Sequence, residues 1–334
     1  MRTNDVLRIG FIGAGGNTKL RHLPGFRAID GVELAAVANR SKHSGEEVAA
    51  EWGIPAVRDD WRSVAGDPGI DAVCIGTWPN LHREATCAAL AAGKHVLCEA
   101  RMARDLREAL EMEEAARSRP DLVAQLVPSP FTLGIDEWIA ARVPALGELL
   151  EIRVRSLGGG LRDPAAPLTW RLDPELSGRN TINLGILHEA ILRWIDFREP
   201  EVVAAAGWAA AERPDPAGGT KATVIPESLQ ATARSAEGVR LLYDLSQLHA
   251  GPAENRIQLN GTKGRIEVDL AKGNALFEID GKEPETRPIE DGWAVEADFV
   301  RSIREGAPVR RTSFADGVEY MRFTEAVWDA WNEC

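Results

Sequence analysis

The sequence predicts an α/β protein in which a doubly wound parallel sheet is followed by an α+β domain with a large, open and mainly antiparallel sheet. Two observations lead to this fold class. Short apolar runs alternate with helical patterns over residues 7–127, which is typical of a parallel sheet with helices on both faces. Beyond Pro130 the pattern changes, and strand-like segments outnumber helices.

Length and composition bound the protein class. A chain of 334 residues is too long for one ordinary core, so we expect two domains, residues 1–128 and 129–334. The net charge of -12 argues against nucleic acid and anionic membranes as partners. The sequence has no signal-peptide pattern and no apolar run of the roughly 20 residues that a membrane helix needs. The 4 cysteines lack metal-ligand spacing, so we expect no metal and a reducing, cytoplasmic location.

The first element is an apolar strand, residues 7–12, that runs into a glycine-rich turn and a helical segment. The first two glycines allow a tight turn and let backbone N–H groups approach a pyrophosphate at a helix N-terminus. The third glycine position of the G-x-G-x-x-G pattern is a threonine, so the fingerprint is incomplete. The residues expected to contact a dinucleotide here are Gly13, Gly15, Gly16, Asn17 and Thr18.

The second strand, residues 32–38, ends in Asn39, Arg40 and Ser41, and these residues bear on cofactor preference. A site that prefers NAD usually has Asp or Glu here to accept from the ribose 2′-hydroxyl, whereas arginine suits a 2′-phosphate. The sequence therefore favours NADP over NAD. Because arginine can also stack on adenine in an NAD site, or lie at a strand end as a plain surface residue, NAD stays an alternative.

Three further strands of the first domain are expected at residues 70–77, 94–99 and 122–127, with helices between them. Ligands of doubly wound sheets bind at the carboxyl ends of the strands. The first of these strands ends in Thr77 and Trp78, which we expect to line the cofactor.

The second domain begins with a strand over residues 149–155, where polar and apolar residues alternate, and a Gly/Pro-rich loop over 158–167. A helix is expected over residues 181–196 and an amphipathic C-terminal helix, packing back on the fold, over 316–332. The strands expected between these helices are residues 201–208, 228–235, 238–245, 256–259 and 265–269. An open sheet needs a cover on its second face, and a partner subunit often supplies one.

Taken together, these motifs resemble the Gfo/Idh/MocA family of nicotinamide-dependent oxidoreductases, which act mostly on sugars, inositols and their relatives. The resemblance extends over nearly the whole chain. It implies a Rossmann domain that binds NADP or NAD, an α+β substrate domain, and a homodimer or homotetramer formed through the open sheet. It also implies that Pro79, Asn80, His82 and Glu99 line the cofactor. The matching segments are the glycine turn with residues 22–24, then 71–82, 93–99, 170–173, the helix opening near Gly178, 261–264 and 312–317.

Three positions depart from the family pattern. Family members usually carry Glu-Lys-Pro after the fifth strand, and the lysine takes part in proton transfer. Here the lysine position is Ala100, followed by Arg101. The family also places Asp and, four residues later, His at the start of a helix in the second domain. Here these positions are Asn183 and Leu187, with His188 one step along, so the acid/base set is altered.

Hydride transfer at a carbinol requires a group that exchanges a proton with the substrate oxygen near neutral pH. The candidates are His188, Glu189 and His249. For each a structural alternative stays open, namely a histidine bonded to backbone, a solvated helix carboxylate and a cap on the sheet. Asn183 can only orient a substrate. Arg101 cannot act as a base, but it can bind or polarise a substrate group or pair with a nearby carboxylate.

Substrate contacts are expected from residues around the loop before the second domain's helix. Trp170 can stack on a sugar face, although it could also be part of the core. Polar contacts are expected from Arg171, Asn180 and His249. The resemblance thus implies a nicotinamide-dependent oxidoreductase of a sugar, an inositol or a related polyhydroxylated molecule. A redox-neutral NAD(P)-dependent lyase or glycosidase and a non-catalytic nucleotide-binding sensor are the alternatives.

Overall fold

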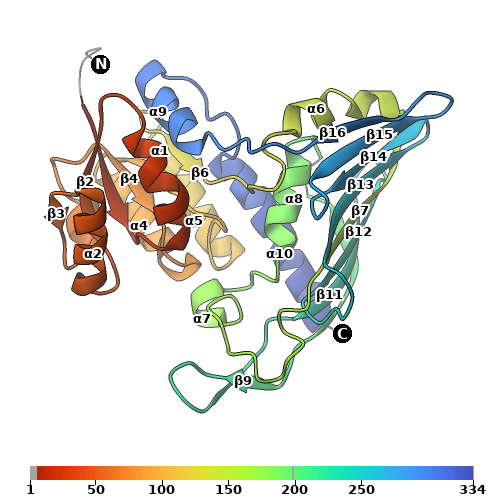
Figure 1. The fold of residues 1–334 in the computed structure, drawn as a ribbon, viewed down its shortest axis with the longest axis horizontal. Coiled ribbons are helices and arrows are strands. Elements are labelled where there is room, and N and C mark those ends of the chain that lie inside the picture. The colour runs from red at the N-terminus through yellow and green to blue at the C-terminus, as the bar shows by residue number, and fades with distance from the viewer. Residues whose placement is uncertain (1–5, 198, 334) are drawn as a thin grey trace. The chain divides into compact units, whose positions relative to one another are not determined.

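The computed structural model describes residues 6–197 and 199–333, and the chain forms two compact units (Figure 1). The first unit comprises Met1–Pro128 and Ala294–Val318, and the second comprises Ser129–Trp293 and Glu319–Cys334. Residues 294–318, expected in the second domain, therefore belong to the first unit, which corrects that prediction. Residues 1–5 and 334, which entered the expectations on targeting and on cysteines, lie outside the described residues.

The first unit is built on a six-stranded parallel sheet in the order β3-β2-β1-β4-β5-β6. Strand β1 pairs with β2 on one side and with β4 on the other, so the strand order reverses beside its carboxyl end. A doubly wound sheet binds its ligand at such a reversal. The predicted sheet is confirmed. Its strands are β1 (Leu7–Ile12), β2 (Val32–Ala38), β3 (Ala56–Val57), β4 (Ala72–Ile75), β5 (His95–Cys98) and β6 (Ala124–Leu126).

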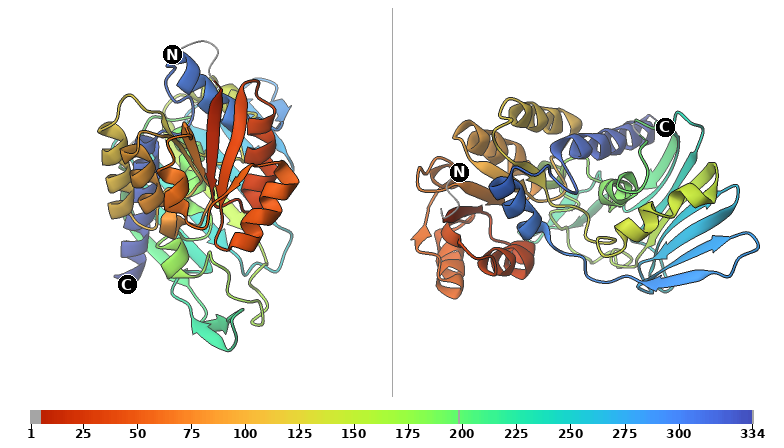
Figure 2. Two further views of the ribbon diagram at one scale, coloured as in Figure 1. Left: turned by 90° about the vertical axis from the view of Figure 1, so that its left-hand side faces the viewer. Right: turned by 90° about the horizontal axis from the view of Figure 1, so that it is seen from above.

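Helices cover both faces of this sheet (Figure 2, left). Because both faces are covered, the strands consist almost entirely of buried apolar residues, as in β4 and β5. The helical elements of the first unit include η1 (Thr18–His22), α1 (Leu23–Arg27), α2 (Lys42–Trp52), α3 (Trp61–Ala65), α4 (Pro79–Ala91), α5 (Leu106–Arg117) and α9 (Val295–Glu305).

Aromatic packing explains why residues 294–318 belong to the first unit. Phe26 of α1 meets Phe11 of β1 edge-on, with ring centroids 6.0 Å apart. On its other side Phe26 meets Phe299 of α9 in the same geometry at 6.2 Å. All three rings are buried, so α9 completes the core of the first unit.

The second unit contains an eight-stranded sheet in the order β16-β15-β14-β13-β7-β12-β11-β8. All neighbouring strands are antiparallel except β12 and β7, which confirms the expected open and mainly antiparallel sheet. The last two strands, β15 and β16, were not predicted. The strands are β7 (Leu149–Leu157), β8 (Glu201–Trp208), β11 (Ser228–Arg234), β12 (Arg240–Ser246), β13 (Glu254–Gly261), β14 (Gly264–Asp269), β15 (Asn274–Ile279) and β16 (Glu285–Pro288).

One face of this sheet packs against two helices, α8 (Leu184–Leu192) and the part of α10 (Phe314–Asn332) that belongs to the second unit. Leu187 of α8 and Phe323 of α10 share a buried apolar core with Val154 of β7 and Leu241 of β12. Shorter elements complete the unit: α6 (Asp136–Ala140), η2 (Val143–Leu146), α7 (Pro174–Ser177), and a hairpin of β9 (Glu212–Pro214) and β10 (Thr220–Ala222).

Two features are absent from the described residues. Among residues 6–197 and 199–333, none of the helices combines the length and the apolar character needed to span a bilayer. Within the same residues, no group of three or more His, Cys, Asp and Glu side chains is placed to hold a metal ion.

Candidate functional site

The turn after β1 is packed tightly against the end of β4. Gly13 has a φ of 81°, in the left-handed region that favours glycine. A Cβ on Gly13 would lie 2.5 Å from Cγ2 of Thr77, and a Cβ on Gly76 would lie 2.1 Å from Oγ1 of Thr18. Neither position accepts a side chain, so the chain's own packing accounts for these two glycines.

Gly15 and Gly16 have a different explanation. Both are exposed. A Cβ on Gly15 would meet no protein atom closer than 3.8 Å, and a Cβ on Gly16 would meet none within 4 Å. Packing therefore does not require glycine at either position, whereas close approach of a phosphate to the backbone does. This part of the turn fits the pyrophosphate of a dinucleotide.

The segment after the turn is a π-helical turn, η1, followed by the short α1, instead of one continuous α-helix. Thr18 stands where the fingerprint has its third glycine. Its side chain is buried, and its hydroxyl donates to the carbonyl oxygen of Gly13 at 3.2 Å. The threonine thus stabilises the turn from within, which explains how the incomplete fingerprint still gives the expected turn.

Two of the three residues predicted at the end of β2 have structural contacts. Asn39 Oδ1 accepts from Ala14 N at 2.7 Å, and its Nδ2 donates to Ser44 O at 3.1 Å. The amide of Asn39 thus joins the glycine turn to α2. Ser41 caps α2, because its Oγ accepts from Ser44 N at 3.3 Å.

Arg40, the third residue, is exposed, and its guanidinium carbon lies 5.4 Å from the ring centroid of Trp78. This is cation–π distance. The structure therefore brings together the ends of β2 and β4 through two residues predicted to contact the cofactor. A cation beside an indole ring can meet both a phosphate and an adenine base.

His82 of α4 holds the ends of β4 and β5 together. Its ring is fully buried, with Nε2 3.1 Å from Thr77 O and Nδ1 3.0 Å from Arg101 O. Burial lowers the pKa of His82, although these carbonyl oxygens favour the protonated ring. His82 is thus placed to shape the site by fixing two strand ends. Beside it, Pro79 is buried and Asn80 is exposed.

Glu99, directly after β5, is the centre of a polar cluster at the glycine turn. Its Oε1 accepts from Asn17 Nδ2 and lies 3.0 Å from His22 Nε2, while its Oε2 accepts from Ala100 N at 3.0 Å. Burial alone would raise the pKa of Glu99, but the hydrogen bonds from His22, Asn17 and the Ala100 N–H outweigh it and lower that pKa. Glu99 is therefore an anion that orients the end of the turn.

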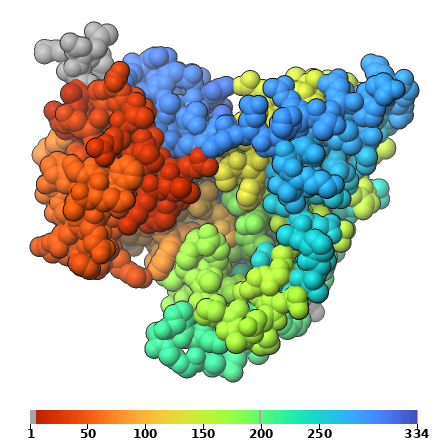
Figure 3. Space-filling view, in the orientation of Figure 1, coloured from red at the N-terminus to blue at the C-terminus, as the bar shows by residue number. Residues whose placement is uncertain are grey.

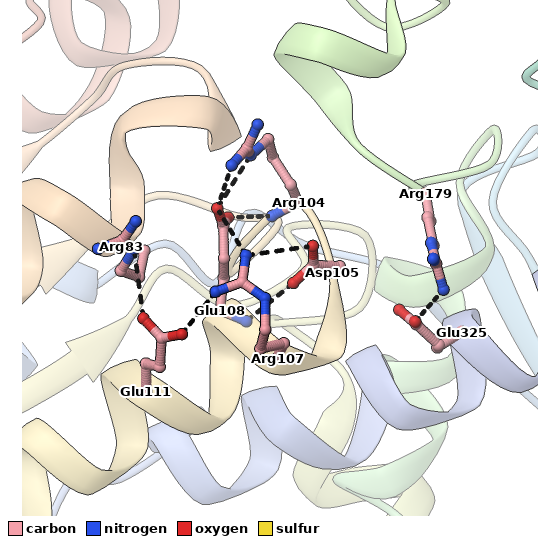
Figure 4. Close-up of polar contacts among 8 residues, drawn as sticks. All are labelled: Arg83, Arg104, Asp105, Arg107, Glu108, Glu111, Arg179 and Glu325. Carbon is pink, nitrogen blue, oxygen red and sulfur yellow. Dashed lines mark hydrogen bonds and ion pairs between the residues drawn. The ribbon is translucent and has the colours of Figure 1, made fainter.

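Arg101 follows Ala100, the residue expected at the family's lysine position, and is 4% exposed. The chain beyond it is anchored to α5, because Arg104 N and Nε donate to the carboxylate of Glu108 at 3.2 and 3.0 Å (Figure 4). Glu108 is buried, and Asp105 caps the same helix. The segment from β5 to α5 is thus held at both ends, by Glu99 and by Glu108.

The start of α8 carries the second motif that is expected to be altered. Asn183 is the half-buried N-cap residue of α8, and its side chain makes no capping hydrogen bond. Leu187, the residue expected at the family's histidine position, is buried in the apolar core of the second unit. Neither side chain can exchange a proton near neutral pH, as expected from their chemistry.

His188 lies inside the second unit. It is 1% exposed, its Nδ1 is 2.7 Å from Tyr243 Oη, and its ring stacks on Phe323 with centroids 4.1 Å apart. Burial lowers its pKa to about 3. These contacts give His188 a structural role, with a tyrosine hydroxyl as its partner. A catalytic role for His188 gains no support from this geometry and stays a prediction.

Glu189 is also interior, at 2% exposure, where a solvated carboxylate was the alternative. It accepts from Ser129 N at 3.0 Å and forms an ion pair with Arg193. Arg193 in turn lies 2.9 Å from Asp136. The carboxylate thus ties the first residues of the second unit to α8, and the geometry again supports a structural role instead of proton transfer.

The residues predicted to contact substrate fall into two groups. Trp170 is half-buried, and the guanidinium carbon of exposed Arg171 lies 4.3 Å from its ring centroid. This pair has the exposure that a substrate contact requires. Asn180 is fully buried, and its Nδ2 donates to Ser177 O at 2.5 Å. Asn180 therefore closes the turn between α7 and α8, and a substrate contact from it gains no support.

His249 is half-buried in the loop after β12, and its backbone N–H donates to Gly158 O at 2.9 Å. The loop around residues 158–167 is fixed by Arg213 of β9, which donates to the carbonyl oxygens of Leu161, Asp163 and Ala166. Figure 3 shows this loop and the β9–β10 hairpin adjoining on the surface of the second unit. The ring of His249 thus belongs to a braced loop region instead of the apolar core.

Three contributing residues were missed by sequence reasoning. Glu296 lies 2.5 Å from His22 although 274 residues separate them, and no local pattern signals such a pair. Arg213 and Glu227 form a bidentate ion pair that is 2% and 0% exposed. Figure 4 also shows Arg179 of the second unit, which pairs with Glu325 of α10.

The chain matches two models of one protein family. Residues 7–125 match the model described as an oxidoreductase family with an NAD-binding Rossmann fold, and residues 138–267 match the GFO/IDH/MocA C-terminal domain. The chain is similar to solved structures too. One, a levoglucosan dehydrogenase in complex with NADH and L-sorbose, has a TM-score of 0.87 at 22% identity, with 98% of this chain and 97% of that one covered.

Among curated proteins, the chain is 25% identical to a levoglucosan dehydrogenase of Pseudarthrobacter phenanthrenivorans, over 87% of this chain and 85% of that protein. It is 28% identical to an inositol 2-dehydrogenase of Acidothermus cellulolyticus, over 98% of this chain and 93% of that protein. Both matches extend over both units described above.

Proposed function

Because the chain belongs to the Gfo/Idh/MocA family of oxidoreductases, we propose that it transfers hydride between a nicotinamide cofactor and a CH–OH group of a sugar, an inositol or a related polyhydroxylated molecule. The observation that carries the proposal is the exposed backbone at Gly15 and Gly16, followed by Asn17 held on Glu99. The names of the two curated relatives support the substrate class. When bound, nicotinamide supplies the hydride acceptor or donor.

The proton of the substrate hydroxyl needs a different carrier from the family's lysine and histidine. Ala100 and Leu187 cannot carry it. Inside the second unit, the ring of His188 bonds Tyr243, and the carboxylate of Glu189 forms an ion pair with Arg193. His249 is the remaining titratable group among the candidates, and it is half-buried on a braced loop. We therefore assign the general acid–base role to His249. Asn183 and the Trp170–Arg171 pair orient the substrate.

The test is turnover with a panel of polyols, levoglucosan and inositol included. The protein is incubated with each polyol and with NAD⁺ or NADP⁺, and the near-ultraviolet absorbance of the reduced nicotinamide is followed. We expect turnover with at least one polyol. Cofactor binding without turnover on any sugar, inositol or related polyol, in either direction, would contradict the proposal.

Among nicotinamide cofactors, we propose a preference for NADP. The end of β2 has no carboxylate for a ribose 2′-hydroxyl, and Asn39 Oδ1 is already occupied by Ala14 N. Arg40 is exposed, as a partner of a 2′-phosphate must be.

Replacing Arg40 with alanine is expected to weaken NADPH binding about tenfold, or about 1.4 kcal/mol, and NADH binding far less. Quenching of tryptophan fluorescence on titration with each nucleotide measures this. Arg62→Ala is a matched control, because Arg62 also lies over a tryptophan ring, 4.3 Å from the centroid of Trp61. Equal weakening of both nucleotides, or of neither, would refute the preference.

We also propose that a second copy of the chain covers the free face of the eight-stranded sheet in a homodimer or homotetramer. This face carries positive and negative side chains in cross-strand ion pairs, such as Arg155 with Asp244 at 3.3 Å and Arg256 with Asp269 at 3.2 Å. A face with charges of both signs can be self-complementary across a two-fold axis. Leu242 of β12 lies on it, since its neighbours Leu241 and Tyr243 face the core.

If a second copy covers this face, Leu242→Asp should dissociate the oligomer, because the added charge would be buried at the contact. Light scattering after gel filtration measures the mass. Leu110→Asp is the control, since Leu110 is an exposed leucine of α5 in the first unit. An oligomer that survives Leu242→Asp, or a monomeric natural protein, would exclude this interface.

A further inference from the structure

His22 connects two carboxylates that come from distant parts of the chain. Its ring is fully buried at the end of η1. Nδ1 lies 2.5 Å from Oε1 of Glu296 on α9, and Nε2 lies 3.0 Å from Oε1 of Glu99 after β5. A neutral imidazole has one N–H and can donate to one carboxylate, whereas the imidazolium donates to both. The geometry is therefore that of a protonated ring.

The fold makes room for this contact at one position. A Cβ on Gly25 of α1 would lie 2.6 Å from Oε2 of Glu296, so a side chain there would displace the carboxylate. Glu296 is 2% exposed. A buried carboxylate needs a charged or hydrogen-bonding partner, and His22 is one. The pairing is thus built into both α1 and α9.

The same ring reaches the glycine turn through one further residue. Glu99, which His22 holds with Nε2, also accepts from Asn17 Nδ2, and Asn17 directly follows the exposed Gly15 and Gly16. We propose that His22 is a positioning residue whose proton holds Glu99 and Asn17 in the arrangement that receives the nicotinamide dinucleotide. This inference rests on the proposed function, and it makes cofactor affinity depend on a group that does not touch the cofactor.

The pH range follows from the neighbours of His22. Burial alone would lower its pKa, but the hydrogen bonds to Glu296 and Glu99 raise it to about 9. The ring thus keeps its proton up to about pH 9 and loses it above. Loss of the proton removes one hydrogen bond and leaves two carboxylates facing each other, so affinity falls as the pH rises through this range.

Other titratable groups close to this cluster stay neutral through the same range. Burial raises the pKa of the Cys74 and Cys98 thiols and lowers that of His82. None of the three therefore changes charge near the pH at which His22 does. A fall in cofactor affinity near that pH can therefore be assigned to His22 if it disappears when His22 is replaced.

The experiment measures the Kd of NADH and NADPH between pH 7 and about 10.5, on either side of the raised pKa, by fluorescence titration of the full chain. The variants are His22→Gln, which keeps one hydrogen bond but carries no proton, and Glu296→Gln, which removes one charge. His43→Gln is the matched control, because the His43 side chain on α2 is 83% exposed and forms an ion pair with Glu47. Circular dichroism checks that each variant is folded, and ¹⁵N-histidine NMR follows the ring directly.

We expect the natural protein to lose affinity as the pH passes about 9. His22→Gln should bind the dinucleotide roughly tenfold more weakly at pH 7, and its affinity should show no fall near that pH. Glu296→Gln should move the fall in affinity to lower pH. A fall in affinity at the same pH as in the natural protein, in either variant, would overturn the inference. If the natural protein binds neither nucleotide at any pH, the proposed function fails instead, and the NMR titration still shows whether the ring bridges the carboxylates.

Discussion

Replacing His249 with glutamine is expected to lower kcat for the polyol substrate by about 10²–10⁴-fold, the usual cost of removing a general acid–base group. The reason is that Ala100 and Leu187, the residues expected at the family's proton-transfer positions, cannot exchange a proton, so the proposed function assigns this role to His249. The Kd of the cofactor should not change, because His249 is not among the residues assigned to the dinucleotide. Steady-state kinetics with the substrate found in the polyol panel measures the effect.

His188→Gln is the matched control for that experiment. The glutamine amide can still bond Tyr243 Oη, so the protein should fold and keep its kcat, with a lower melting temperature from the lost stacking on Phe323. The opposite pattern, full activity for His249→Gln and loss for His188→Gln, would return the catalytic role to His188. It would also mean that the ring leaves its buried position during turnover.

Replacing Glu227 with leucine is expected to lower the free energy of unfolding by about 3–5 kcal/mol, the range for breaking a buried ion pair. Arg213 and Glu227 are 2% and 0% exposed, and Arg213 Nε and Nη2 each donate to the carboxylate at 2.6 Å. Removing the carboxylate leaves a guanidinium charge buried without its counter-charge. Urea unfolding, followed by tryptophan fluorescence, measures the loss.

The double variant Arg213→Met, Glu227→Leu tests the cause. It removes both charges, so it should recover part of the lost stability, but not all, because three carbonyl oxygens of the 161–166 loop lose their donor. Asp59→Ala serves as a surface comparison, since Asp59 and Lys42 form an exposed pair with little expected effect. A Glu227→Leu loss no larger than that of Asp59→Ala would show that the pair does not brace the loop.

Local signals explain what could be predicted about the first unit. Gly13 and Gly15 follow an apolar strand, and the tight turn at Gly13 arises from neighbours in sequence and from the end of β4. Strand ends such as Thr77 and Glu99 could be placed because each follows a continuous apolar run. Parallel pairing then brings these ends to one edge of the sheet.

Long-range contacts could not be predicted from one sequence. The segment that contains Glu296 and Phe299 lies beyond the whole second-unit sheet in the chain, yet it completes the first unit's core. No periodicity in α9 names its partner, because an amphipathic helix can pack on any apolar surface. The bridge from Glu296 to His22 was invisible for the same reason.

The start of α8 shows a different limit. A histidine next to the family's histidine position invites a catalytic interpretation, but one residue along a helix is a rotation of about 100°. That rotation takes His188 onto Tyr243 and Phe323 in the core, and Glu189 onto Arg193. Sequence showed which residue types were available, whereas packing decided which of them are interior.

Transfer of hydrogen from a labelled substrate tests the central claim most directly. The polyol found in the panel, carrying deuterium on the carbinol carbon, is incubated with the protein and oxidised nicotinamide cofactor, and the products are analysed by mass spectrometry. The account predicts that reduced nicotinamide accumulates with one deuterium for each ketone formed. Product that forms without net accumulation of reduced nicotinamide would contradict it and would identify a redox-neutral reaction.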